Sequence, residues 1–163
     1  MLVHEGAVLG AQLREFGGNG GIGDRDGARI AQNADVIDWH EAMPLAGLLG
    51  IEGLAQAREE VRARLAWRED LCTAGGVMHG GALMALADCA AGMCAYLNLP
   101  EGAAGTATIQ SSTNFLRPVR EGYAEAVSRP LNVGRTIIVV ETEIVDAEGR
   151  AVARVVQSQA VLR

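Results

Sequence analysis

The chain has 163 residues and a mass of 17.1 kDa, and 49% of its residues are hydrophobic, which suffices for one domain with a buried core. The formal net charge is −6 and arginines do not cluster into a basic stripe, so nucleic acid is not expected as a partner. All 14 basic residues are Arg. The absence of Lys excludes Schiff-base chemistry and a lysine-containing phosphate-binding loop.

The three cysteines are Cys72, Cys89 and Cys94. Their odd number, with two of them in an apolar run, predicts small buried side chains in a reducing compartment and neither a disulfide framework nor a metal site. The N-terminus lacks a charged-then-apolar signal pattern, and Gly, Asp and Cys interrupt the longest apolar run. We therefore expect a cytoplasmic protein with no membrane contact.

Residues 1–35 include a glycine-rich stretch at 17–27 and no apolar periodicity, which predicts a flexible N-terminal extension before a single domain over residues 36–163. A helix is expected over Asp38–Leu49, with Asp38 as its N-cap, Pro44 as its weak point and Gly50 as its end.

Alternating apolar residues within Ala55–Trp67 predict a strand with one buried face, formed by Val61, Ala63, Leu65 and Trp67. A helix that is apolar on every face follows from Gly80 to Leu97, and such a helix must be buried. Turn signals then separate four further strands, expected to be consecutive antiparallel neighbours, over Thr106–Leu116, Gly122–Asn132, Thr136–Asp146 and Arg150–Leu162.

These elements predict an α+β fold with a five- or six-stranded antiparallel sheet wrapped around one long central helix. Such a sheet leaves its edges and one face of the helix uncovered. A second copy is the simplest cover, so we expect at least a homodimer.

Asp88 is the most informative residue, because it is a carboxylate in the middle of the apolar run 80–97. Burying an ionised acid without partners costs several kcal/mol, roughly, even after relaxation. Asp88 therefore has either a chemical role or an Arg partner from a distant element.

The sequence His79-Gly80-Gly81 begins this helix, where backbone N–H groups lack intrahelical partners and the helix dipole is positive. Two glycines would let a carbonyl oxygen that gains negative charge come close to these amides. The alternative is that the glycines only allow tight packing of the helix start.

Gly80 and Asp88 are separated by about 12 Å along one helix, at about 1.5 Å per residue, so one helix cannot bring both to one small carbonyl. Two antiparallel copies of the helix at a dimer interface can do so. We therefore expect a site shared between Gly80 of one chain and Asp88 of the other.

These residues resemble a known family. The sequence HGGAL at 79–83, the run LADCAAG at 86–92, the threonines at 106 and 108 and the sequence NFLRP at 114–118 are similar to the hotdog-fold acyl-CoA thioesterases of the phenylacetic-acid-degradation (PaaI-like) type. The resemblance covers roughly residues 43–163. It implies a dimer or a dimer of dimers that hydrolyses a coenzyme A or carrier-protein thioester, with no cofactor other than the coenzyme A of the substrate.

Carried over residue by residue, the resemblance implies that Asp88 is the catalytic acid, Gly80 the oxyanion amide, His79 the motif histidine and Thr108 a helper hydroxyl. The family often has Asn six residues before the histidine, where this chain has Thr73, and some relatives have a hydroxyl where this chain has Gly92. Thr73 can still donate a hydrogen bond, with shorter reach.

The implied reaction is hydrolysis of an acyl thioester, with Asp88 as general base on water or as nucleophile through an anhydride. His79 is expected to position the loop or the thioester rather than act as a base. Gly81 is expected to contact the substrate, and the coenzyme A phosphates have three candidate ligands, any of which could instead be a solvated charge: Arg117, Arg120 and Arg135.

Two other classes remain open, a hotdog-fold enoyl-thioester hydratase or dehydratase and a non-catalytic acyl-CoA-binding protein. The sequence also does not identify the acyl group of the substrate. A medium-chain or aryl-acetyl pocket could be lined by Met84, Met93, Tyr96 and Leu97, which could equally belong to the core.

Overall fold

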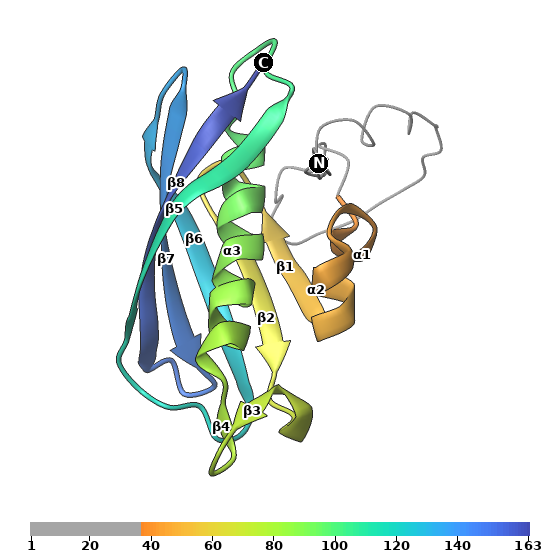
Figure 1. The fold of residues 1–163 in the computed structure, drawn as a ribbon, viewed down its shortest axis with the longest axis vertical. Coiled ribbons are helices and arrows are strands. Elements are labelled where there is room, and N and C mark those ends of the chain that lie inside the picture. Colours follow the sequence, from red (N-terminus) through yellow and green to blue (C-terminus); the bar gives the residue numbers. More distant parts are fainter. Residues whose placement is uncertain (1–36) are drawn as a thin grey trace, which may run out of the picture.

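A computed structural model describes residues 37–163, and the predicted extension over residues 1–35 lies outside this range. A six-stranded antiparallel sheet curls around one long helix, as the sequence predicts. In Figure 1 this helix, α3 (Gly80–Leu97), runs along the concave side of the sheet, and two short helices lie beside β1.

The N-terminal helix is broken in two. Asp38 caps α1 (Trp39–Ala42) as predicted, because its carboxylate accepts hydrogen bonds from the backbone N–H groups of His40 and Glu41. The continuous helix predicted over Asp38–Leu49 is wrong, since α2 (Pro44–Leu49) begins anew at Pro44, which has no N–H to continue α1. Gly50 ends α2 in the left-handed conformation, with φ 72°.

The strand predicted within Ala55–Trp67 is confirmed over residues 61–66, but it is the second strand of a hairpin whose first strand was not predicted. The chain forms a hairpin of β1 (Ile51–Gln56) and β2 (Val61–Ala66), and Trp67 lies beyond it. The predicted alternation does hold in β2, because Val61, Ala63 and Leu65 are fully buried. β1 was missed because only its first residue is buried, so it carries no apolar alternation.

After β2 come a short 3-10 helix, η1 (Glu69–Leu71), and a small two-stranded ribbon of β3 (Cys72–Thr73) and β4 (Val77–Met78), which leads into α3. The four predicted C-terminal strands are all present, with ends shifted by one residue at most. They are β5 (Gly105–Phe115), β6 (Tyr123–Val133), β7 (Ile137–Asp146) and β8 (Ala151–Leu162).

The strand order in the sheet is β1-β2-β6-β7-β8-β5. The strands β6, β7 and β8 are consecutive neighbours as predicted, but β5 pairs with β8 at the edge of the sheet and not with β6. The segment between β5 and β6 therefore crosses from the sheet edge to its middle instead of forming a hairpin.

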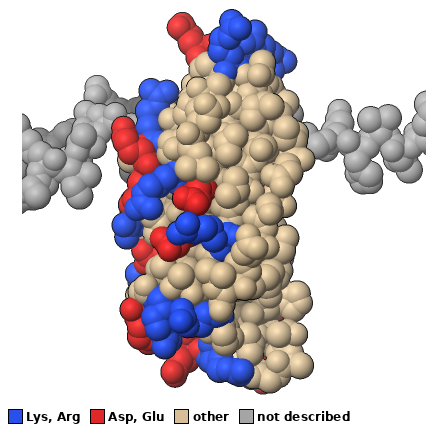
Figure 2. All heavy atoms as spheres, turned by 90° about the vertical axis from the view of Figure 1, so that its left-hand side faces the viewer, with Lys and Arg blue, Asp and Glu red and all other residues tan. Residues whose placement is uncertain are grey.

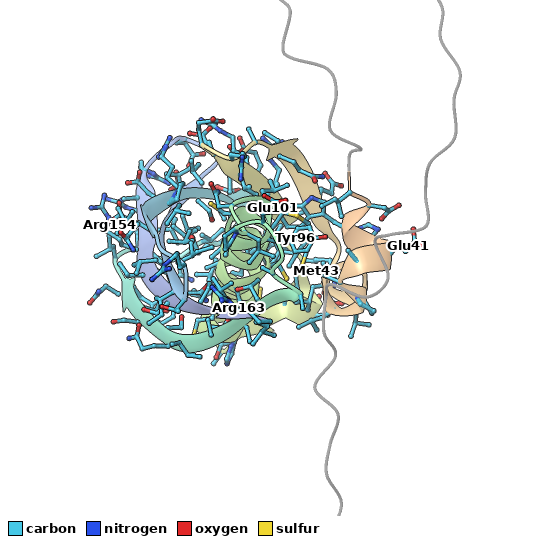
Figure 3. The ribbon with its side chains drawn as sticks, turned by 90° about the horizontal axis from the view of Figure 1, so that it is seen from above. Glu41, Met43, Tyr96, Glu101, Arg154 and Arg163 are labelled. Atoms are coloured by element: carbon cyan, nitrogen blue, oxygen red, sulfur yellow. The ribbon has the colours of Figure 1, made fainter. Side chains whose placement is uncertain are left out.

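The core lies between α3 and the concave face of the sheet. Many of the residues that α3 buries are small, which lets the strands approach its backbone closely. These are Ala82, Ala87, Ala90, Ala91 and Ala95. Seen from above in Figure 3, the sheet curls around α3 and Arg154 projects from its outer side, where it faces Glu141 and Glu143.

One face of α3 is not covered by the sheet. Gly81, Met84 and Asp88 are exposed, and Gly92 and Tyr96 are half-buried, at intervals of three or four residues. The expectation that α3 is buried on every face is therefore wrong for the single chain. By length and mean hydropathy (1.4) α3 could also span a membrane, contrary to expectation, although 56% of it is buried within the fold.

The uncovered face of α3 adjoins β5, and together they form a surface that we call the α3–β5 face. β5 contains no charged residue, and Asp88 is the only one in α3. Figure 2 shows charged side chains gathered on one side of the molecule and an adjoining side nearly free of them.

Candidate active site

The N-terminus of α3 leaves one backbone amide free. His79 is the N-cap, and its Nδ1 accepts a hydrogen bond of 2.8 Å from the N–H of Gly81. The N–H groups of Ala82 and Leu83 donate to the carbonyl of His79. Among residues 37–163, nothing accepts a hydrogen bond from the N–H of Gly80. The amide predicted to stabilise an oxyanion is therefore available, whereas that of Gly81 is occupied.

In this structure one ring nitrogen of His79 is used to cap α3. Because its Nδ1 accepts from an amide, the proton of the neutral ring lies on Nε2. The ring also lies close to Gly81, where a Cβ would approach Nδ1 to 2.9 Å. In this structure His79 therefore caps the start of α3.

Gly80 opens onto a pocket of about 420 Å³. The pocket is lined mainly by apolar groups and includes, besides Gly80, two other predicted site residues, Thr73 and Arg117. Phe115 also lines it and lies over Gly80, where a Cβ would be 3.0 Å from the ring Cζ. Phe115 belongs to the sequence NFLRP at 114–118, but no role at the site was predicted for it. Asp88 does not line this pocket.

Asp88 is exposed in the single chain, so the premise that it is a buried acid is wrong. The alternative of an Arg partner is not found among the described residues either. Its Oδ1 accepts hydrogen bonds from the hydroxyl of Thr108 (3.1 Å) and from Nε2 of Gln157 (2.9 Å). The contact with Thr108, predicted as the helper hydroxyl, places these two residues side by side.

Gln157 and Gln159 were missed by the sequence analysis. Both are on β8 and only 1% exposed, and Gln159 contacts Thr108 and Gln157. The sequence did carry a signal for this network. The alternate, inward positions of β8 hold Ala153 and Val155 and then the two glutamines. Polar residues at core positions of a strand indicate a built polar network.

The three arginines lie in different places. Arg117 is in the pocket lining and donates to the carbonyl of Ala151 at 2.9 Å, and Arg120 donates to the carbonyl of Gly75 at 2.8 Å. Arg135 is in the turn between β6 and β7, at the opposite end of the sheet from β3 and β4 in Figure 1. Within one chain, Arg135 is thus not brought together with the other two.

Two further expectations concern apolar and sulfur-containing side chains. Met93 is fully buried and belongs to the core, whereas Met84 is 43% exposed on the α3–β5 face. Cys89 and Cys94 are buried as predicted, and burial raises the pKa of each thiol to about 11. Neither is therefore a nucleophile near neutral pH. Cys72 is only half-buried.

Comparison with known proteins assigns the family. Residues 75–153 match the pattern of the Thioesterase superfamily. The chain is 34% identical over 97 residues to a Saccharolobus solfataricus protein named "Putative esterase", covering 60% of this chain and 68% of that protein. It is 35% identical over 75 residues to the 1,4-dihydroxy-2-naphthoyl-CoA hydrolase of Escherichia coli, covering 46% and 54%.

Solved structures show the same fold. The structure of the N33D mutant of the phenylacetic acid degradation protein PaaI from Thermus thermophilus has 28% sequence identity and a TM-score of 0.67, covering 73% of this chain and 99% of that chain. The chain therefore belongs to the thioesterase superfamily, with the hotdog fold and PaaI-like relatives. It is a hydrolase that acts on thioesters.

Proposed function

We propose that this protein hydrolyses acyl-CoA thioesters to a free acid and coenzyme A, with Asp88 as its catalytic acid–base group or nucleophile. The observation that carries the proposal is the state of Asp88. It is the one charge of the α3–β5 face, and Oδ1 is held by two donors while no described residue donates to Oδ2. A carboxylate oxygen held free at an apolar surface is suited to react.

In the general-base route, Oδ2 takes a proton from water as the water oxygen bonds to the thioester carbon. The carbonyl oxygen becomes an oxyanion and accepts from the free N–H of Gly80. The C–S bond then breaks, and the proton passes from Asp88 to the leaving thiolate, which regenerates the carboxylate. As a nucleophile, Oδ2 would instead bond to the thioester carbon, and the C–S bond would break with release of the coenzyme A thiolate. Water would then hydrolyse the resulting anhydride to the free acid and the Asp88 carboxylate.

The two groups lie far apart on one helix, so the proposal includes a second copy. Antiparallel packing of two α3–β5 faces would put Gly80 of one chain opposite Asp88 of the other. Thr73, Arg117 and Arg120 would then lie toward the substrate side of the Gly80 pocket. We place the reaction in the cytoplasm, without a metal or a cofactor other than the coenzyme A of the substrate.

The experiment is a panel of acyl-CoA substrates assayed for free thiol with wild-type protein and with Asp88→Asn. The variant should fold with an unchanged thermal midpoint within a few degrees, because Asp88 is exposed. Its kcat should fall by at least about 10²-fold, the lower end of what one acid–base group supplies. Wild-type hydrolysis by a folded Asp88→Asn would refute the role of Asp88.

The same panel separates the other classes. A hydratase would remove the enoyl absorbance of an unsaturated acyl-CoA without release of thiol. A binding protein would saturate with acyl-CoA and turn over none of it.

A further inference from the structure

We propose that Gln157 is a positioning residue that fixes the Asp88 carboxylate so that Oδ2, and not Oδ1, faces the reacting thioester. Gln159 and Thr108 complete the ring of hydrogen bonds that holds it. The inference rests on the proposed catalytic role of Asp88. Neither glutamine belongs to the sequence segments that resemble the family motif.

The burial of both glutamines calls for an explanation. Gln157 and Gln159 occupy inward positions of β8 with 1% exposure each, where neighbouring inward positions hold Ala153 and Val155. A buried amide costs stability unless its donors and acceptors are paired, so an apolar residue would serve the core at least as well. The two amides thus occupy positions where packing alone does not favour them.

The orientation of each amide follows from Asp88. A carboxylate only accepts hydrogen bonds, so the NH2 group of Gln157 must face Oδ1, at 2.9 Å. Its carbonyl Oε1 then faces Gln159 and accepts from Nε2 at 3.2 Å. The second proton of the Gln159 amide is donated to the hydroxyl of Thr108 at 2.9 Å.

Thr108 closes the ring. Its hydroxyl lies 3.1 Å from both Oδ1 of Asp88 and Oε1 of Gln159. Because the amide nitrogen of the same Gln159 donates to this hydroxyl at 2.9 Å, we assign its one proton to Oδ1 of Asp88. Oδ1 of Asp88 therefore accepts from Gln157 on one side and from Thr108 on the other, and Gln159 donates to both of these residues. Two donors fill the lone pairs of Oδ1, which leaves Oδ2 as the reactive oxygen.

A bulge in β5 brings the strand residues into place. The pairing of β5 with β8 shifts between Thr108 and Gln110, so Ile109 is an extra residue, and it is 59% exposed. Because of this extra residue, Thr108 and Ser111 both face β8 residues of the inward side, opposite Gln159 and Gln157. Ser111 takes up the remaining proton of the Gln157 amide, at 3.2 Å.

The test replaces Gln157 by Met, which keeps the length of the side chain and removes the donor. Removing a hydrogen bond to a charged group should lower kcat by about 10- to 100-fold. KM should change by no more than about twofold, because Gln157 is buried and does not contact the substrate. If the Met variant fails to fold, Gln157→Asn takes its place in the test. The side chain of Asn is one methylene shorter, so its amide cannot reach Asp88, and the same loss of kcat is expected.

Thr142→Val is the matched control. Thr142 is also fully buried and polar, on β7, and its hydroxyl bonds, among residues 37–163, only that of Ser128, at 2.7 Å. Its replacement removes a buried hydrogen bond of the core away from Asp88, so kcat should stay at the wild-type value. A fall in kcat equal to that of Gln157→Met would mean that any loss of buried polar contact lowers activity, and would overturn the proposal.

A double-mutant cycle separates this proposal from the proposed function. If Gln157 acts through Asp88, adding Gln157→Met to Asp88→Asn should lower kcat no further. An additive loss, or wild-type kcat in a folded Gln157→Met while Asp88→Asn is inactive, would refute the positioning role alone. Wild-type activity of Asp88→Asn would instead refute the proposed function.

Discussion

The N-cap of α3 shows how one side chain can select the amide that remains available. His79 binds the N–H of Gly81, and its carbonyl takes those of Ala82 and Leu83. The unpaired donor is thus confined to Gly80, at the positive end of the helix. An Asp or Ser cap would also satisfy the helix, but an imidazole additionally leaves an Nε2–H directed away from it.

The proposed role of the Gly80 N–H in stabilising the oxyanion can be tested without disrupting the first turn of α3. Gly80→Pro removes the N–H at the first helical position, where proline is tolerated, and should lower kcat by about 10²- to 10³-fold. Gly80→Ala keeps the N–H but places a Cβ 3.0 Å from Phe115 Cζ. It should lose less activity and recover it in a Phe115→Leu background. Steady-state thioesterase kinetics of the wild type, the two single variants and the Gly80→Ala/Phe115→Leu double variant measure these effects. Equal losses of kcat in Gly80→Pro and Gly80→Ala would exclude a catalytic role for the Gly80 amide.

At the residue scale, the sequence identified the groups that a motif names and missed those that support them. Asp88 and Gly80 were found because a charge and a glycine pair stand out in their local pattern, whereas Thr108 was found because the family resemblance implies it. The contact of Asp88 with Gln157 joins residues 69 positions apart. Nothing local fixes such a contact, and neither the exposure of Asp88 nor the bulge at Ile109 can be read from single-residue preferences.

Among the elements, α1 is held to the sheet by the contact of one indole with one glycine. Trp39 is 4% exposed and lies against Gly53 of β1, where a Cβ would overlap the indole ring. On the same side, Nε2 of His40 pairs with the carbonyl of Ile51 at 2.9 Å. The glycine in β1 is thus required by close packing rather than by its backbone conformation.

Gly53→Ala should therefore force Trp39 outward. We expect a loss of about 1–3 kcal/mol in the free energy of unfolding, as for other overpacked cores, together with a red shift of tryptophan emission. Urea denaturation measures the first and fluorescence the second. In a Trp39→Ala background the same substitution should cost much less, since the ring is gone, and an equal cost in both backgrounds would contradict this packing.

The pairing of two strands was predicted correctly only where a short turn joins them. The segments after β6 and β7 are short and carry turn signals, so the neighbours β6, β7 and β8 follow from the sequence. The partner of β5 does not. Its pairing with β8 is decided by which edge of the curled sheet remains open, and that depends on the whole fold. Pro44 likewise broke a helix that its flanking residues favour.

At the scale of the whole molecule, the α3–β5 face combines an open sheet edge, exposed Met84 and Ile109, and one charge. An uncharged edge strand of 11 residues is the kind of edge that natural proteins cover. These features support the proposed dimer, in which each site takes residues from both chains.

Mixed dimers test the shared site directly. Asp88→Asn and Gly80→Pro homodimers should each be inactive, whereas a mixed dimer has one site with both lesions and one with neither, and about half of wild-type activity. Random exchange makes about half of the dimers mixed, so about a quarter of wild-type activity should return. Native mass spectrometry confirms the mixed species. Mixed dimers without activity would place the whole site in one chain.

The bulge at Ile109 makes the length of β5 as important as its side chains. At its present length, β5 could pair with β8 without the bulge only by placing Thr108 and Ser111, which are three residues apart, on opposite faces of the sheet. Deletion of Ile109 would leave the two hydroxyls two residues apart and therefore both inward, on a regular strand. We therefore expect the loss of Ile109 to be tolerated better than an insertion between residues 108 and 111, which would move Ser111 away from Gln157.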